Sequence, residues 1–116
     1  MNVLITGSEG FIGSHLVEYF YKKKFKVHAL IQYNSFNNIG WLSSVNRKIL
    51  SKINLIFGDI RDENSIEIAT KNIDLVINCA ALISIPYSYQ ARRSYVDNNI
   101  LGTFNILENS LKNKNI

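Results

Sequence analysis

Three glycines near the start of the chain have a spacing that suits phosphate binding. Gly7, Gly10 and Gly13 follow one another in the sequence MNVLITGSEGFIG. Before them, Val3–Ile5 is an apolar run typical of a buried strand, and after them Phe11–Lys23 has helical periodicity. In such a unit the glycines allow a tight turn, close backbone approach to phosphate and close packing of helix on strand. Because a helix start presents free backbone N–H groups, the unit predicts a dinucleotide pyrophosphate site.

The residues that would contact the rest of a dinucleotide follow from the same pattern. Phe11 and Ile12 are expected to offer backbone N–H groups or apolar contact beside the phosphates. An acid usually binds the ribose hydroxyls about twenty residues after the glycines, at the end of the second strand. This sequence reads IQY there, with no Asp or Glu, so Gln32, Asn34 and Ser35 are the candidate ribose ligands. An acid would exclude a 2′-phosphate and an arginine would bind one, and neither is present, so both NAD and NADP stay open.

Apolar runs and turn residues divide the remaining chain into alternating strands and helices. The expected elements are a strand at Lys26–Ile31, a polar stretch at Tyr33–Asn38, a short helix at Ile39–Val45, a loop or helix at Asn46–Ser51, a strand at Ile53–Phe57, a helix at Asp62–Thr70 capped by Asp62, a strand at Ile73–Ala80, a loop at Leu82–Gln90 and a helix at Arg93–Leu111. Strands that alternate with helices favour right-handed crossovers and a parallel sheet. The predicted fold class is therefore α/β, a Rossmann-like doubly wound parallel sheet cut off after about four strands. The near-continuous apolar character of the fourth strand predicts a strand that is covered on both faces.

Composition excludes several other classes of protein. With 47% hydrophobic and 19% charged residues in 116, the chain is expected to be one globular domain or part of one. The net charge of +4 comes from scattered lysines without a nucleic-acid-binding motif, so no nucleic-acid partner is expected. No run is long enough to span a membrane, and the start does not resemble a signal peptide. Cys79, the single cysteine, lies in an apolar run and is expected to be a buried, reduced thiol in a cytoplasmic protein.

The end of the chain falls where the alternation predicts a fifth strand. The last expected helix carries apolar residues at steps of three to four, and only a short polar turn follows it before Ile116. We therefore expect residues 1–116 to be the N-terminal part of an NAD(P)-binding domain whose catalytic and substrate-binding parts lie elsewhere. The uncovered sheet edge and the apolar helix face would then make this part marginally stable or prone to association.

Four motifs, in an order that one family shares, cover nearly the whole chain. They are the glycine loop VLITGSEGFIGSHL, the turn GDIRD at 58–62, the strand end NCAA at 78–81 and the helix motif DNNILGT at 97–103. Together they resemble the extended short-chain dehydrogenase/reductases that act on nucleotide sugars. Two further stretches, ALIQYNSFNNIGWL and AALISIPYSYQARRSYVDNN, look most like the NAD-dependent 4,6-dehydratases of UDP-N-acetylglucosamine-type sugars, which serve the synthesis of modified surface sugars.

The resemblance implies roles for particular residues. The Asp59 carboxylate would accept from the adenine amino group while Ile60 packs on the ring. Ala80 and Ala81 would let the cofactor approach the end of the fourth strand. Asn99, rather than Asn98, would hold that strand end near the nicotinamide ribose. Each residue also has an ordinary structural alternative, as a turn former, a small packing residue or a solvent-facing amide.

The resemblance also implies partners. NAD is the expected cofactor, with NADP left open, and a UDP-sugar is the expected substrate, bound beside Ser84 and Tyr87. A homodimer is expected for the intact protein, and neither a membrane nor a metal ion is expected as a partner. His15 and His28 have no acidic or cysteine cluster around them at metal-ligand spacing.

The implied reaction removes a hydride from the sugar C4, loses water across C5 and C6, and returns the hydride to C6. A tyrosine with a nearby lysine would act as the base. Tyr19 and Lys23 have the family's Tyr-x-x-x-Lys spacing, but they lie in the first helix, so no catalytic residue is assigned. The alternatives are a 4-epimerase or reductase of the same family, a non-enzymatic NAD(P)-binding regulator and a self-contained four-stranded binding module.

Overall fold

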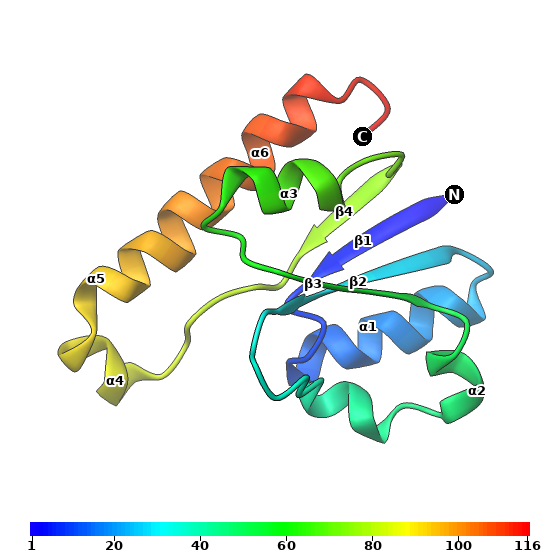
Figure 1. Cartoon of the computed structure of the whole chain (residues 1–116), viewed down its shortest axis with the longest axis horizontal. Helices are drawn as coiled ribbons and strands as arrows, with labels where there is room; N and C mark the ends of the chain where they lie inside the picture. The colour runs from blue at the N-terminus through cyan, green and yellow to red at the C-terminus, as the bar shows by residue number, and fades with distance from the viewer.

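A computed structural model describes all 116 residues as a parallel sheet between two layers of helices (Figure 1). The elements are β1 (Asn2–Thr6), α1 (Phe11–Lys22), β2 (Lys26–Gln32), η1 (Gly40–Ser44), α2 (Arg47–Leu50), β3 (Asn54–Gly58), α3 (Glu63–Ala69), β4 (Leu75–Asn78), α4 (Ile85–Gln90), α5 (Arg92–Tyr95), η2 (Val96–Leu101) and α6 (Gly102–Lys112). The strand order is β3-β2-β1-β4, and every neighbouring pair is parallel. This architecture confirms the predicted Rossmann-like α/β fold.

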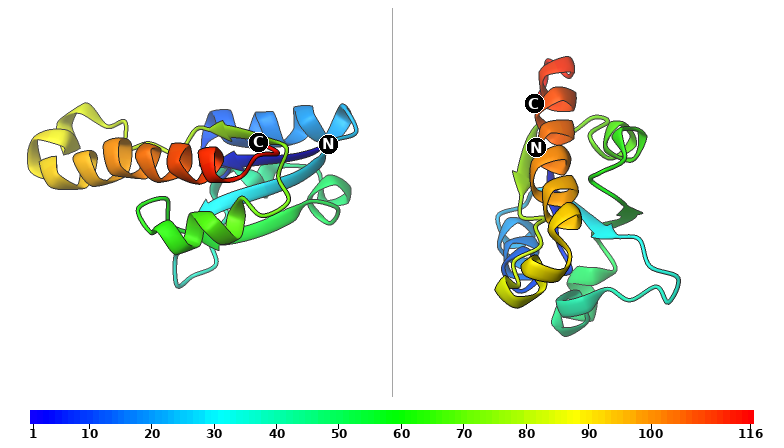
Figure 2. Two further views of the ribbon diagram at one scale, coloured as in Figure 1. Left: turned by 90° about the horizontal axis from the view of Figure 1, so that it is seen from above. Right: turned by 90° about the vertical axis from the view of Figure 1, so that its left-hand side faces the viewer.

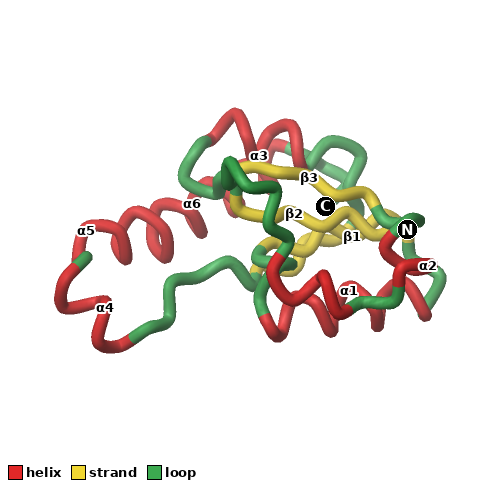
Figure 3. Tube along the Cα trace, turned by 60° about the horizontal axis from the view of Figure 1, so that its bottom comes forward, coloured by secondary structure: helices red, strands yellow, loops and turns green.

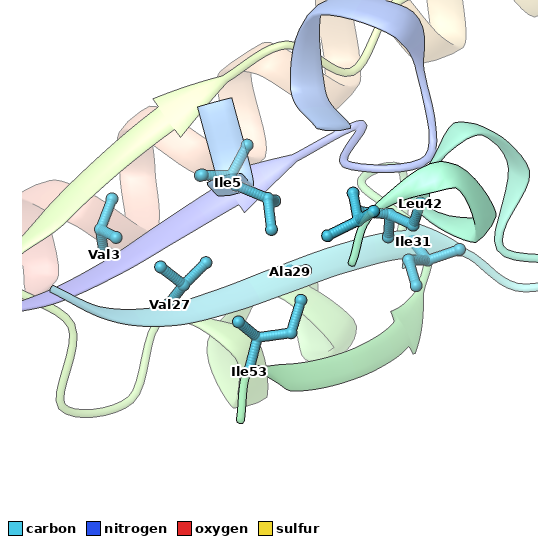
Figure 4. Close-up of a cluster of buried hydrophobic side chains, with 9 residues drawn as sticks. Val3, Ile5, Val27, Ala29, Ile31, Leu42 and Ile53 are labelled. Carbon is cyan, nitrogen blue, oxygen red and sulfur yellow. The ribbon is translucent and has the colours of Figure 1, made fainter. Parts of the chain in front are cut away.

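The alternation of side chains along the strands produces two separate cores. Val3 and Ile5 of β1 face the layer of α1, η1 and α2, while Leu4 between them faces the layer of α3 and α6. Figure 3 shows the strands between these two helical layers, and Figure 4 shows the first core, in which Leu42 of η1 packs over β1 and β2. Both faces of the central strands are therefore buried, which explains the apolar runs Val3–Ile5 and Ala29–Ile31 within them.

The edge strand β4 differs from its prediction. It spans Leu75–Asn78 rather than residues 73–80, and its apolar side chains are only half-buried. The prediction of a strand covered on both faces holds in part, because Leu75 and Ile77 pack against one core and Val76 packs against the other. The burial is incomplete, since β4 is an edge strand with β1 as its only neighbour. Cys79, just beyond the strand, is a free thiol and is half-buried rather than fully buried.

The first turns of α3 and α4 are both capped by side chains, and only the first of these helices was predicted. The Asp62 side chain caps α3 by accepting from the backbone N–H of Ser65, as expected. The predicted loop Leu82–Gln90 instead contains the helix α4. Pro86 marked a loop in the sequence, but it stands in the first turn of α4, where a helix needs no N–H from it, and Ser84 caps that turn.

The last helix is continuous from Arg92 to Lys112 and contains a π-helical segment, η2, in its middle. It extends past the sheet with α4 at its far end, as Figure 2 shows from two further directions. Gly102, Asn105, Ile106 and Asn109 form the buried side of α6. The regularly spaced apolar residues are exposed instead: Val96, Ile100, Phe104, Leu107 and Leu111. The expected uncovered apolar helix face is thus present, and none of the helices combines the length and apolar character that crossing a membrane requires.

A buried amide on α6 fixes the turn that follows β3. The Asn105 side-chain N–H group donates to the carbonyl oxygens of Ile60 and Arg61, both at 3.0 Å. We expect Asn105→Ala to lower the free energy of unfolding by about 1–3 kcal/mol, because it leaves two carbonyls without their partner. Chemical denaturation measures this change. Asn115→Ala, at an exposed position without side-chain hydrogen bonds, is the control and should stay within about 0.5 kcal/mol. Equal effects of the two substitutions would contradict the assignment.

Candidate cofactor-binding site

A cleft opens at the carboxyl ends of the strands, where β1 is followed by β2 on one side and by β4 on the other. The reversal of chain order at this point is where parallel α/β sheets bind their ligands. Seven of the predicted site residues line the cleft: Gly7, Gly10, Gln32, Asp59, Ile60, Ala80 and Ala81. Three loops that lie far apart in the sequence therefore meet at the predicted place.

The glycine loop is packed against the rest of the site on two sides. Gly7 has a φ of +62°, and a Cβ there would lie 2.8 Å from the Ala80 backbone. A Cβ on Gly13 would lie 2.2 Å from the Gly7 carbonyl oxygen. Gly10 is different, because a Cβ there would meet only that carbonyl oxygen, at 3.2 Å, and would otherwise project into open space. Gly7 and Gly13 are thus needed for packing, and Gly10 leaves the floor of the cleft clear.

Helix α1 begins at this floor with its N-terminus open. Its N-cap residue is Gly10, no side chain caps the helix, and no acidic residue lies in the first turn. The first backbone N–H groups and the positive end of the helix dipole are therefore not neutralised by the protein. Ser8 is buried and anchors the loop, since its N–H donates to the Leu30 carbonyl at 3.2 Å and its hydroxyl to the Ile5 carbonyl at 2.6 Å. The arrangement fits a pyrophosphate group.

The opposite wall follows β4 and is held by a hydroxyl of β1. Thr6 Oγ1 accepts from the backbone N–H groups of Cys79 and Ala80, each at 3.1 Å, and donates to Asn78 Oδ1 at 2.6 Å. The end of β1 therefore positions the small residues that border the cleft. Burial raises the pKa of the Cys79 thiol beside them, so this thiol is neutral at physiological pH.

The turn after β3 presents an ionised carboxylate to the cleft. The Asp59 carboxylate accepts from the Arg61 guanidinium Nε at 2.9 Å and from the Arg61 backbone N–H at 2.9 Å. These bonds and the nearby positive charge lower the pKa of Asp59 below its usual value, so its charge is lost only in strong acid. Ile60, which also lines the cleft, is buried, and its side chain packs against Gly102. Asp59 is thus available as an acceptor throughout the neutral pH range.

Two asparagines of η2 approach the segment beyond β4. Asn99 binds the backbone of Leu82 twice, because Oδ1 accepts from its N–H and Nδ2 donates to its carbonyl, both at 2.9 Å. Asn98 lines the cleft itself and donates to Asn99 Oδ1 at 3.2 Å. Both stand in the π-helical segment, a feature that is frequent at functional sites. Asn99 therefore acts on the position of the chain, and Asn98 is the amide that faces the cleft.

Several predicted residues lie outside the cleft lining. Phe11 and Ile12 are more than half exposed, and the Phe11 ring packs on Trp41 with 5.2 Å between ring centroids. Ser35 is exposed, and the Asn34 side chain binds the backbone of Asn38 within its own loop, accepting at 2.7 Å and donating at 2.8 Å.

The residues proposed for the sugar lie on α4 and at its start. Ser84 uses its hydroxyl to cap α4, and Tyr87 packs beside Tyr95, whose hydroxyl donates to the Ser84 carbonyl. Tyr19 and Lys23 lie far from the cleft lining on α1, where the Lys23 ammonium sits 5.7 Å from the Tyr19 ring centroid. Their spacing reflects helix geometry rather than a catalytic pair.

The cleft also contains an acid that the sequence pattern did not indicate. Glu9, in the middle of the glycine loop, lines the cleft, and its Oε1 accepts from the Gln32 backbone N–H at 3.0 Å. Its second oxygen, Oε2, is buried and has no hydrogen-bond partner. Because the pattern places an acid at the end of β2, a glutamate 23 residues earlier in the chain gave no signal.

The fold and this cleft are those of a dinucleotide-binding α/β protein. Residues 4–115 match the family model described as GDP-mannose 4,6 dehydratase, so the chain belongs to this family of NAD-dependent epimerases and dehydratases. Its relatives include the dTDP-D-glucose 4,6-dehydratase of Dictyostelium discoideum, 37% identical over 91% of this chain and 25% of that protein. Another is the bifunctional UDP-glucose and UDP-xylose 4-epimerase 3 of Arabidopsis thaliana, 33% identical over 96% of this chain and 33% of that protein.

Solved structures agree with this placement. The UDP-glucose 4-epimerase of Bifidobacterium longum, solved with NAD+ and UDP, superposes with a TM-score of 0.82 at 29% identity. That match covers 99% of this chain and 35% of the epimerase. The chain spans a third or less of the length of the curated relatives named above. NAD in such neighbours agrees with the cofactor expected from the sequence.

The bonds of Thr6 give a test of how the wall of the cleft is held. Thr6→Val keeps the shape of the side chain but removes the acceptor of the Ala80 N–H group. The Cys79 N–H group loses one of two acceptors, since it also donates to the Thr6 carbonyl oxygen at 3.3 Å. We expect the Ala80 amide to lose protection in hydrogen exchange, and the free energy of unfolding to fall by about 1–3 kcal/mol. Thr70→Val is the matched control, because the buried Thr70 hydroxyl donates only to carbonyls of its own helix, α3. Unchanged protection at Ala80 in Thr6→Val would show that the hydroxyl does not hold this wall.

Proposed function

We propose that this chain forms the NAD-binding part of a nucleotide-sugar 4,6-dehydratase, with residues 1–116 as the N-terminal part of an NAD(P)-binding Rossmann domain. The observation that carries the proposal is the meeting of the open glycine loop, the Asp59 turn and the Ala80 wall in one cleft at the point of strand reversal. The match to the dehydratase family model supports it, as does the NAD in a superposable epimerase structure.

Different segments around the cleft would bind different parts of the cofactor. The loop at Gly10 and the start of α1 would hold the pyrophosphate, and the ionised Asp59 would accept from the adenine amino group. The wall at Ala80 and Ala81, fixed through Thr6 and Asn99, would border the nicotinamide half. When bound, NAD supplies a hydride acceptor that is restored within each turnover. The contribution of this chain is to hold and orient the reacting groups.

The sugar nucleotide and the setting of the reaction complete the proposal. A UDP-sugar would lie next to the segment beyond β4, with Ser84 and Tyr87 as the nearest candidates for contact. The protein would act in the cytoplasm as a homodimer, and the exposed apolar residues of η2 and α6 support association. A 4-epimerase is the second candidate, because relatives with that name match the chain at 33% and 30% identity, against 37% for the dehydratase.

Substitutions at two glycines of the loop should affect cofactor binding and protein stability separately. Gly10→Val should weaken NADH binding by at least about tenfold, because its methyl groups would occupy the phosphate position while the backbone of Gly10, at φ −76° and ψ 168°, tolerates them. Fluorescence titration of NADH, with an unfolding curve for each variant, measures both properties. Gly13→Ala is the contrast, since its clash with the Gly7 carbonyl should lower stability. NADH affinity unchanged in Gly10→Val would contradict the phosphate-loop assignment.

Product analysis distinguishes the two reactions. The protein at its natural length, incubated with NAD and UDP-N-acetylglucosamine, should form a 4-keto-6-deoxy sugar nucleotide that has lost the mass of one water. Mass spectrometry detects this loss directly. A stereoisomer of unchanged mass would support the epimerase instead. Bound NAD without turnover of any UDP-sugar would contradict both enzymes and favour a cofactor-binding regulator.

A further inference from the structure

We propose that Glu9 supplies the ribose-binding carboxylate that β2 lacks, and that it thereby makes the cleft select NAD over NADP. This inference rests on the proposed binding of a nicotinamide dinucleotide. By its position in the sequence Glu9 belongs to the glycine loop, yet the proposal makes it the residue that binds the ribose and favours NAD.

The Glu9 carboxylate lies at the end of β2, although Glu9 belongs to the loop after β1. Glu9 lies in the loop after β1, but its Oε1 accepts from the backbone N–H of Gln32, the last residue of β2, at 3.0 Å. Strands β1 and β2 are neighbours in the sheet, with Thr6 beside Leu30. The carboxylate therefore reaches the strand end where a ribose-binding acid stands in the sequence pattern. It lines the same cleft as Gly10 and Asp59.

The backbone around Glu9 is held in place. The Glu9 carbonyl oxygen accepts from the Trp41 N–H at 2.9 Å. Gly40 packs so closely on this residue that a Cβ on Gly40 would lie 2.5 Å from the Glu9 carbonyl oxygen and 3.1 Å from Glu9 Cβ. Together with the bond to Gln32, these contacts fix both ends of the glutamate. A ligand oxygen that meets the carboxylate thus meets a preorganised group.

The second carboxylate oxygen identifies the ligand chemistry. Glu9 Oε2 is buried and has no partner within the protein, although a buried polar atom usually has one. The bond to Gln32 requires only one oxygen, so an uncharged amide would serve that structural role equally well. A vicinal diol satisfies the other oxygen by donating a hydroxyl hydrogen. A 2′-phosphate at the same place would bring negative charge next to the Glu9 carboxylate and would be repelled.

The test compares cofactors on the protein at its natural length. Calorimetry gives the Kd of NAD, NADP and 2′-deoxy-NAD for the wild type and for Glu9→Gln, which keeps an acceptor for Gln32. We expect the wild type to lose about tenfold in affinity when the 2′-hydroxyl is removed, as for a bond to a charged group. In Glu9→Gln this loss should shrink, and the preference for NAD over NADP should fall by about tenfold or more.

Controls separate the possible failures. Glu67→Gln removes one exposed negative charge on α3, outside the cleft, and should leave both comparisons unchanged. Glu9→Asp keeps the charge but shortens the side chain, so it should reduce the same preference and decides the matter if Glu9→Gln does not fold. A wild type that binds neither NAD nor NADP would overturn the proposed function. A wild type that binds NAD, with the 2′-hydroxyl dependence and the cofactor preference unchanged in both Glu9 variants, would overturn only the role of Glu9.

Discussion

The close backbone contact of Gly7 with Gly13 and with Ala80 is the constraint on which the cleft depends. Three chain segments meet there, namely the end of β1, the start of α1 and the residues beyond β4. Any Cβ on Gly7 or Gly13 would fall within 3 Å of another backbone. The loop can therefore lie flat between helix and strand only when both positions lack a side chain. This contact keeps the open end of α1 at the cleft and brings the segment after β4 next to it.

Polar side chains hold the chain segments that continue past the ends of the strands. Where a ladder ends, backbone groups lose their strand partners and must be satisfied in another way. Thr6 binds the amides of Cys79 and Ala80, Asn99 binds both backbone groups of Leu82, and Asn105 binds two carbonyls after β3. Each of these side chains comes from a neighbouring element. The irregular walls of the cleft are thus held by hydrogen bonds from the elements around them.

The elements were largely predictable from local chemistry, and the deviations have local causes. Apolar runs located the four strands, and Asp62 marked the start of α3 because an acidic side chain can cap free N–H groups. Pro86 led to the wrong prediction of a loop, because proline occurs both after the end of a helix and in the first turn of one. Only the cap residue Ser84 before it indicates the start of a helix. Asn34 was proposed as a ribose ligand because it lies near the end of β2 in the sequence. Its amide is engaged within its own turn, a competition that no periodicity reveals.

The position of Glu9 shows why a site can be predicted while one of its ligands is missed. A sequence motif specifies the acid by its distance along the chain. Ribose binding depends instead on where the carboxylate lies in the folded protein. The end of β2 and the loop after β1 lie side by side in the sheet, so a side chain from either can occupy that place. A missing acid on β2 therefore says nothing about the cofactor until the neighbouring loop is considered. In this chain the carboxylate of Glu9, whose Oε2 is buried without a partner in the protein, lies at that place. Under our proposal, the choice between NAD and NADP passes to the same loop that is expected to hold the phosphates.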